Sequence, residues 1–283
     1  MTGERDAPVS GRSRRVNIMP AKDLGLVTEG WDYVPGQVSV RRVRGTDNRI
    51  KIQMRVDLGV LQMEARGRPD GHHPYGHESL LEYHLARVAA YRQMNGTDLG
   101  FSLDQKECRE IREETFQYYQ RYLANFVLED FEAVARDTKR NLRALDLCVT
   151  YAVEDEDRYG LEVYRPYIVM MHSQSMALLA MRQSAYRTAL THVEVGLQAI
   201  RTFFKRMGQG KVFRHSGEAQ VLRTLRREIR RHLPVDPIRD LRKQLRQAIT
   251  EERYEEAARL RDELDAILLD PQVRLEEQGQ TRE

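Results

Sequence analysis

The densest group of metal-ligand side chains in the sequence is formed by His72, His73 and His77, with Asp70 and Glu78 beside them. His73 and His77 would share one face if the segment were helical, and imidazole and carboxylate groups are ligands for zinc. The segment is rich in glycine and proline, however, and no matching His or Cys pair stands elsewhere in the chain. We therefore expect exposed loop histidines here, with no metal and no cofactor.

A second candidate for chemistry is the segment Gly-Gln-Gly-Lys at residues 208–211, which is similar to part of a phosphate-binding loop. The first glycine of the required spacing is absent, Val212 replaces the Ser or Thr, and no strand is predicted before it. The glycines are better explained as the end of a helix. No catalytic triad or nucleophile elbow is recognisable either, so the sequence predicts a protein that is not an enzyme.

The strongest candidate for nucleic-acid binding is a basic helix near residue 225. One face of it is apolar and the other basic. The apolar stripe is Leu222, Leu225, Ile229 and Leu233, and the basic residues are Arg223, Arg227, Arg230 and Arg231. Guanidinium groups bind phosphates, so this face could contact DNA. Alternatively, it pairs with acidic segments of the same chain: residues 201–250 carry 14 Lys or Arg against 4 Asp or Glu, whereas residues 251–283 carry 5 against 11.

An antiparallel helical hairpin is predicted close to the C-terminal end of the sequence. Pro237 suits the first turn of a helix, and apolar residues then recur at steps of three and four. The first stripe is Ile238, Leu241, Leu245, Ala248 and Ile249, and the second is Tyr254, Ala257, Leu260, Leu264 and Leu268. The polar stretch 250–253 between them is long enough only for a tight turn. Two helices this short are marginal alone, so we expect the hairpin to need a packing partner.

The second helix of this hairpin carries the segment Tyr-Glu-Glu-Ala-Ala at residues 254–258, followed by Leu260, Arg261 and Asp262. This pattern resembles the UVR motif, the helical hairpin shared by the excision-repair proteins UvrB and UvrC. The resemblance covers about 35 residues and implies docking on another protein, either UvrB/UvrC-like or a second copy of this chain. By this resemblance the hydrophobic seam of the motif would be Leu241, Leu245, Ile249, Tyr254, Ala257, Leu260 and Leu264, with Arg261 and Asp262 as its polar signature. The helicase and nuclease motifs of UvrB and UvrC are missing, as are the zinc-binding CxxC pairs of other UVR proteins.

The composition of the chain agrees with a helical, soluble protein. Of its 283 residues, 41% are hydrophobic and 31% are charged, with few glycines and prolines. No run of about 18 apolar residues and no signal-peptide pattern is present, which leads us to expect a cytoplasmic protein. Cys108 and Cys148 fall in helical patterns and are expected to be buried thiols.

The predicted fold class is mainly α. Alternating apolar residues in 38–65 indicate a small antiparallel β-meander, and helical spacing begins near Glu78. We expect a long helix that starts with Ser102 as its N-cap, and a loop at the acidic residues 154–157. Small residues near Gly196 resemble those of a tetratricopeptide repeat, although an ordinary helical bundle explains them equally well. The predicted parts are a tail at 1–17, the meander at 18–75, a tetratricopeptide-like helical body at 76–233, the UVR hairpin at 236–269 and a tail at 270–283.

Together these features favour a cytoplasmic, non-enzymatic adaptor that recruits a partner through its C-terminal hairpin. The alternative is a DNA-repair accessory protein that binds nucleic acid through residues 201–250 and contacts UvrB or UvrC. The salt dependence of DNA binding separates the two, because phosphate contacts weaken steeply as salt rises.

Overall fold

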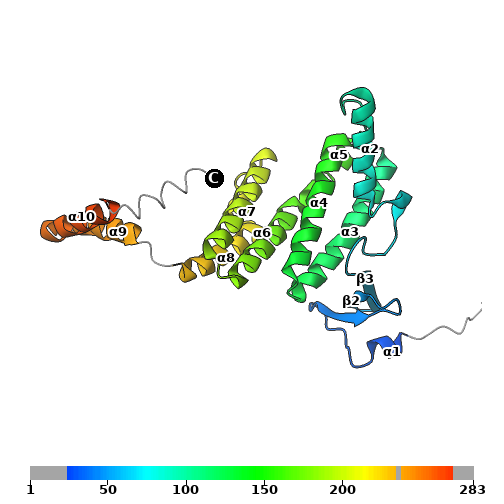
Figure 1. Cartoon of the computed structure of the whole chain (residues 1–283), viewed down its shortest axis with the longest axis horizontal. Helices are drawn as coiled ribbons and strands as arrows, with labels where there is room; N and C mark the ends of the chain where they lie inside the picture. Colours follow the sequence, from blue (N-terminus) through cyan, green and yellow to red (C-terminus); the bar gives the residue numbers. More distant parts are fainter. Residues whose placement is uncertain (1–23, 234–236, 270–283) are drawn as a thin grey trace, which may run out of the picture.

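The computed structural model of the chain describes residues 24–233 and 237–269, so both predicted tails lie outside the described residues. A short helix α1 (Gly25–Thr28) leads into a three-stranded sheet, and helices make up the rest (Figure 1). The chain is therefore mainly α, with the predicted meander and the predicted hairpin, which confirms the expected fold class. None of the described helices is long and apolar enough to cross a membrane.

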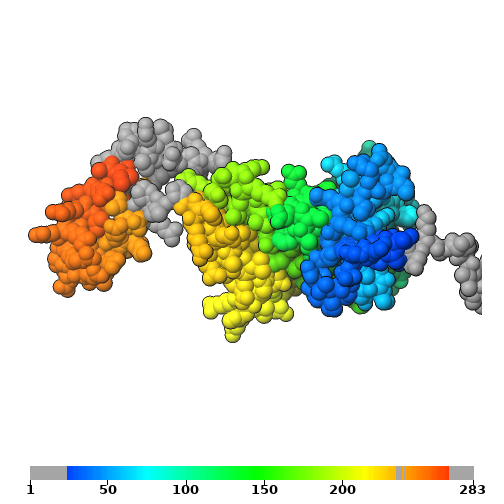
Figure 2. Space-filling model, turned by 90° about the horizontal axis from the view of Figure 1, so that it is seen from below, coloured from blue at the N-terminus to red at the C-terminus, as the bar shows by residue number. Residues whose placement is uncertain are grey.

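The sheet is an antiparallel meander in the order β1 (Ser39–Arg44), β2 (Ile50–Val56), β3 (Gly59–Glu64). Alternation places Ile52, Met54 and Met63 on one face, where they are buried and pack with Ala124 of helix α3. Three strands need such a cover, since a small sheet is not stable alone in water. In the space-filling view the sheet, in blue, lies directly against the helices of the body (Figure 2).

Three helices follow the sheet: α2 (Leu80–Asn95), α3 (Gln105–Val127) and α4 (Phe131–Tyr151). The predicted N-cap of α3, Ser102, is wrong. Asp104 caps the helix instead, because its carboxylate accepts from the Glu107 amide while the Glu107 side chain accepts from the Asp104 amide. This reciprocal capping box satisfies two amides that a serine two residues earlier could not reach.

The second half of the body consists of α5 (Asp155–Tyr159), α6 (Arg165–Arg182), α7 (Tyr186–Arg206) and α8 (Gly217–His232). Three short 3-10 turns, η1 (Pro74–Gly76), η2 (Glu162–Tyr164) and η3 (Val212–Arg214), connect elements of the body. The acidic residues 154–157 were predicted to be a loop, but they begin α5. Acidic side chains favour the first turn of a helix, where the amides are unpaired.

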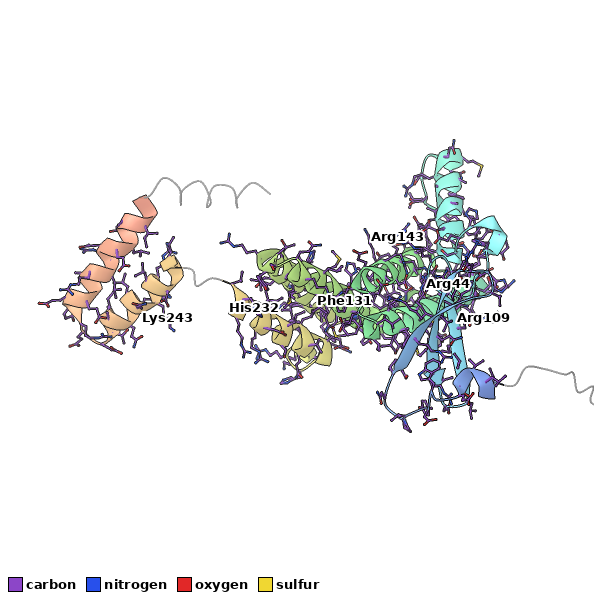
Figure 3. The ribbon with its side chains drawn as sticks, turned by 60° about the horizontal axis from the view of Figure 1, so that its bottom comes forward. Arg44, Arg109, Phe131, Arg143, His232 and Lys243 are labelled. Atoms are coloured by element: carbon purple, nitrogen blue, oxygen red, sulfur yellow. The ribbon has the colours of Figure 1, made fainter. Side chains whose placement is uncertain are left out.

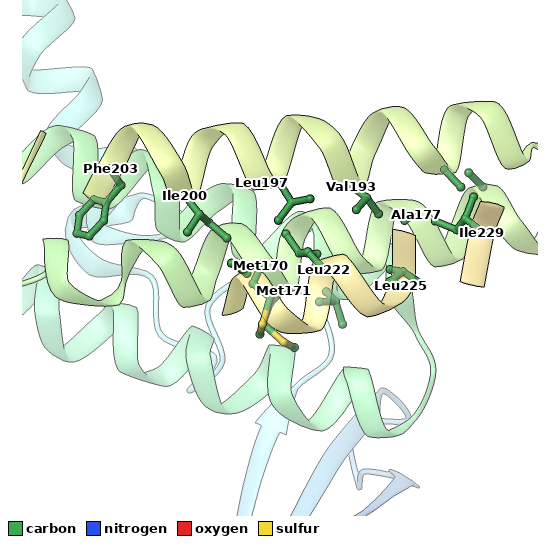
Figure 4. Packing of buried hydrophobic residues seen from close by; sticks show 14 of the residues in the cluster. Met170, Met171, Ala177, Val193, Leu197, Ile200, Phe203, Leu222, Leu225 and Ile229 are labelled. Carbon is green, nitrogen blue, oxygen red and sulfur yellow. The ribbon is translucent and has the colours of Figure 1, made fainter. Parts of the chain in front are cut away.

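Helices α6, α7 and α8 enclose the largest apolar cluster, which Figure 4 shows from close by. Leu222, Leu225 and Ile229 of α8 point toward Val193 and Leu197 of α7. Gly196 permits the close approach of α6 to α7, since a Cβ atom there would lie only 2.3 Å from the Ser173 hydroxyl oxygen. The stripe of α8 predicted from the sequence is thus a packing face.

Two ion networks are buried inside the body, and the first of them joins α3 and α4 to the sheet. The guanidinium of Arg121 donates to both carboxylate oxygens of Asp137, at 2.7 and 2.9 Å, and to the carbonyls of Glu64 and Gly67. Glu114 of α3 accepts from the amides of Leu80 and Leu81 at the start of α2. These networks fasten the segment after β3 and the first turn of α2 to α3 and α4.

A buried histidine of α2 makes the stability of the body depend on pH. His84 is almost inaccessible, and its Nδ1 lies 2.9 Å from a guanidinium nitrogen of Arg87. The pKa of His84 is lowered to about 4, mainly by burial, with Arg87 also lowering it and Glu107 opposing the shift. In the unfolded chain, the imidazole of His84 takes up a proton near pH 6.5. The stabilising effect of the neutral, buried ring is therefore complete above that pH and is lost as the pH falls toward 4.

We therefore expect the free energy of unfolding to fall by about 1 kcal/mol between pH 7 and pH 5, after allowance for solvent screening. Urea unfolding at both pH values measures this difference. The variant His84→Gln should lose most of this pH dependence of the free energy of unfolding. The variant His73→Gln, at an exposed position, should retain it. Equal pH dependence in the two variants would contradict the assignment to His84.

Candidate protein-docking site

The C-terminal hairpin consists of α9 (Pro237–Thr250) and α10 (Tyr254–Leu269), with residues 251–253 as the turn predicted from the sequence. The amide of Arg253 donates to the carbonyl of Ala248 at 2.8 Å and the amide of Glu252 to that of Ile249 at 3.2 Å. Glu252 adopts a positive φ of 57°, which reverses the chain direction within three residues.

The hairpin has an apolar seam of its own between the two helices. Five residues are buried in it: Leu241, Ala248, Ala257, Leu260 and Leu264. Ile238, Leu245 and Ile267 are half-buried against them. Four of the residues predicted to bind a partner, Leu241, Ala257, Leu260 and Leu264, therefore hold the hairpin together. Sequence reasoning did not include Ala248, the most buried of the five, among the site residues, although its place in the stripe was visible.

Two other predicted apolar residues of the site, Ile249 and Tyr254, lie outside the seam. Ile249 is 53% exposed and Tyr254 is 68% exposed, on either side of the turn. Leu245 and Ile249 are four residues apart, so they lie one turn apart on the same edge of α9. We call Leu245, Ile249 and Tyr254 the docking edge. These three side chains present apolar surface that the hairpin itself leaves wholly or partly uncovered.

The two helices of the hairpin carry opposite charges. Residues 237–250 contain four Lys or Arg and one Asp, whereas residues 254–269 contain two Arg and five Asp or Glu. Lys243 projects from α9 in Figure 3, and most of the charged residues on that helix are basic. Arg261 and Asp262 are both exposed and pair with each other at 2.7 Å, and this hydrogen bond raises the pKa of Arg261.

Comparison with known protein families identifies this segment. Residues 236–268 match the family model described as the UvrB/uvrC motif. The hairpin is a UVR motif. The prediction made from Tyr254 to Asp262 is thereby confirmed, and the matched residues include all of α9 and all but the last residue of α10. No curated protein and no solved structure matches the chain.

The four arginines predicted as a nucleic-acid surface lie on α8, N-terminal to the UVR hairpin, and two of them contact other elements of the body. Arg223 donates to the carbonyls of Phe213 and Arg214, and its guanidinium lies 4.9 Å from the Phe213 ring centre. Arg230 pairs with Glu194 of α7 at 3.2 Å. Arg227 and Arg231 are exposed. The basic face is therefore partly engaged in binding α8 to η3 and α7.

The histidine cluster contacts an aromatic side chain, and the glycine segment 208–211 follows the end of a helix. The ring of His77 meets Tyr83 edge-on at 5.6 Å, and Tyr75 stacks on the same Tyr83 at 4.3 Å. Among residues 24–233 and 237–269, no group of three or more His, Cys, Asp or Glu is arranged to hold a metal ion. Gly208 has a φ of 68° just after the end of α7, the position expected for a helix-ending glycine.

Proposed function

We propose that this protein is a non-enzymatic adaptor that docks on a helical hairpin of a partner through its UVR hairpin. The observation that supports this most is the division of the apolar residues of the hairpin into a buried seam and an uncovered docking edge. Exposed apolar side chains on a surface otherwise rich in charge are typical of a protein contact. A helical hairpin also gains stability when a second apolar face covers it.

The charge pattern indicates what kind of partner fits. A partner hairpin with one acidic and one basic helix can place its acidic helix beside α9 and its basic helix beside α10. A second hairpin of the UVR type has this form, so a UvrB/UvrC-like protein and a second copy of this chain are the two candidates. Such pairing speeds association and sets orientation, while the docking edge supplies the affinity.

The body would act as the rigid part of the adaptor. Within each of its helix pairs α3–α4 and α6–α7 a short turn joins the two helices, and Gly196 allows the second pair to pack closely. These features support a tetratricopeptide-like arrangement, in which stacked helix pairs build a platform. We further propose that the adaptor works in the cytoplasm.

The substitution Ile249→Asp tests the docking edge. In the full chain, it should weaken binding to a partner UVR hairpin about tenfold or more, because a buried carboxylate would lose its hydration in the contact. Binding is measured by calorimetry against the UVR hairpin of UvrB, and self-association by sedimentation. Leu245→Asp should abolish binding, although Leu245 also touches the seam and this variant can weaken the hairpin itself.

The matched control is Gln247→Asp, which places the same charge on an exposed position of α9 away from the docking edge. If Ile249→Asp and Gln247→Asp bind alike, the docking edge has no role. Titration with duplex DNA in the same experiment addresses the alternative function. Binding that falls tenfold or more on raising salt, and that Arg227→Ala weakens, would favour a DNA-repair accessory protein over the adaptor.

A further inference from the structure

An aromatic cleft lies in the body, on the side of α3 that faces α6. It has a volume of about 640 Å³ and is lined by α3, α4, α6, the segment between α5 and α6, and the first turn of α8. Five aromatic residues contribute to it: Phe116, Tyr119, Tyr122, Tyr164 and Tyr167. A volume of this size lies within the range of sites that hold a ligand or a peptide segment.

The aromatic rings form a continuous series from the mouth of the cleft to its floor. Phe116 is 58% exposed at the mouth and stacks on Tyr119 at 5.8 Å. Tyr119 meets the buried Tyr122 edge-on at 5.4 Å, and Tyr167 of α6 lies 6.2 Å from it on the opposite wall. Tyr164 is 59% exposed. So much exposed aromatic surface in one concave place marks a binding surface.

The polar groups of the cleft indicate what it would bind. The hydroxyls of its four tyrosines form no hydrogen bond with any residue that the structure describes. Burial raises the pKa of both Tyr122 and Tyr167, so these hydroxyls remain protonated donors. They are suited to donate to carbonyl oxygens of a ligand. A chain in the polyproline conformation offers its carbonyls free of internal hydrogen bonds, and its pyrrolidine rings pack on aromatic faces.

The charges of the cleft favour a basic ligand. Arg112 at its wall is neutralised by Asp157, with 2.5 Å between their nitrogen and oxygen atoms. Glu218 is half-buried in the wall, and no partner for its carboxylate exists within 24–233 or 237–269. A Lys or Arg of a ligand would find a carboxylate here and an aromatic face for a cation–π contact.

We propose that this cleft binds an extended, proline-rich peptide that carries a basic residue. The prolines pack on the rings of Phe116, Tyr119 and Tyr167, the tyrosine hydroxyls donate to the peptide carbonyls, and the basic side chain pairs with Glu218. The adaptor would then have two separate docking surfaces, the UVR hairpin for a helical partner and the aromatic cleft for an extended one. The cleft does not depend on the docking edge, since none of its lining residues belongs to the hairpin.

The test titrates the full chain with a synthetic proline-rich peptide that contains lysine, and follows binding by calorimetry. Tyr164→Ala and Phe116→Ala should each weaken binding about tenfold, the loss expected when an aromatic anchor is removed. Tyr75→Ala is the matched control, because Tyr75 is also an exposed tyrosine but lies outside the cleft. Glu218→Gln should remove the preference for the lysine peptide over the same peptide with glutamate in place of lysine.

The proposal is overturned if the lysine peptide fails to bind the unaltered chain. It is overturned equally if a peptide with alanine in place of proline binds as well, or if Tyr164→Ala and Tyr75→Ala bind alike. The variant Ile249→Asp should bind the peptide like the unaltered chain. This last measurement separates a failure of the cleft from a failure of the hairpin, because each surface has its own variant and its own ligand.

Discussion

Replacement of Asp137 by alanine is expected to lower the free energy of unfolding by about 3 to 5 kcal/mol. Arg121 and Asp137 are each only 1% exposed, and the carboxylate neutralises a guanidinium that water cannot reach. Without Asp137, the buried cation keeps only two carbonyl partners, those of Glu64 and Gly67. Domains of this kind are stabilised by about 5 to 15 kcal/mol, so the loss is a large part of the total. Urea denaturation followed by circular dichroism measures it.

Two further variants distinguish this buried pair from ordinary surface charges. Arg143 and Glu82 also pair across helices, but both are about half exposed (Figure 3 labels Arg143), and Arg143→Ala should cost about 1 kcal/mol or less. The double variant Arg121→Met, Asp137→Leu removes both charges and should be more stable than Asp137→Ala alone. A double variant as unstable as the single one would show that an uncompensated charge is not the cause.

The elements predicted most accurately from the sequence are those with a regular apolar period and a marked end. The strands around Ile52 alternate over a full meander, and α2 ends at Asn95 before Gly96, which has a φ of 75°. The UVR hairpin combines both signals with a proline at its start. In these segments local preference and tertiary packing agree, and the residue types alone therefore indicate the structure.

The ion networks could not be predicted in the same way. Glu114, Arg121 and Asp137 stand in helices where most charged residues face solvent, and a sequence gives no sign that these three face inward. Their burial depends on partners 16 to 57 residues away, such as the carbonyl of Glu64. The same holds for the aromatic cleft, since Phe116 of α3 and Tyr164 of η2 come together only when α3 and α6 both pack on α4. Long-range packing, and not local pattern, creates both features.

The docking site shows a third way in which the sequence pattern leaves the structure undetermined. The apolar stripes of α9 and α10 were visible in the sequence, but a stripe does not tell which of its members face the other helix of the hairpin and which face outward. Leu260 is buried in the seam whereas Ile249 is exposed, although both belong to the predicted stripes. That division arises from the angle at which the two helices pack, and it decides which substitutions test docking and which only unfold the hairpin.

The second large effect is expected at Glu114, which is fully buried between four donors. Its carboxylate accepts from the amide of Leu80 at 2.8 Å, lies 3.4 Å from Nε of Arg68, and pairs with Arg140. Glu114→Ala leaves both guanidinium groups without their buried countercharge and the first amides of α2 without an acceptor. We expect a loss of about 3 to 5 kcal/mol in the free energy of unfolding.

The variant Glu114→Gln separates the two roles of this side chain. A glutamine has nearly the same shape and can still accept from the amide of Leu80, but it does not neutralise Arg68 or Arg140. It should therefore be less destabilising than Glu114→Ala, and hydrogen exchange at Leu80 should stay slow in Glu114→Gln and become fast in Glu114→Ala. If both variants unfold within about 1 kcal/mol of the unaltered chain, Glu114 does not hold α2 on α3. If Glu114→Gln instead matches Glu114→Ala in stability while the Leu80 amide stays protected, the charge of Glu114 carries the whole effect.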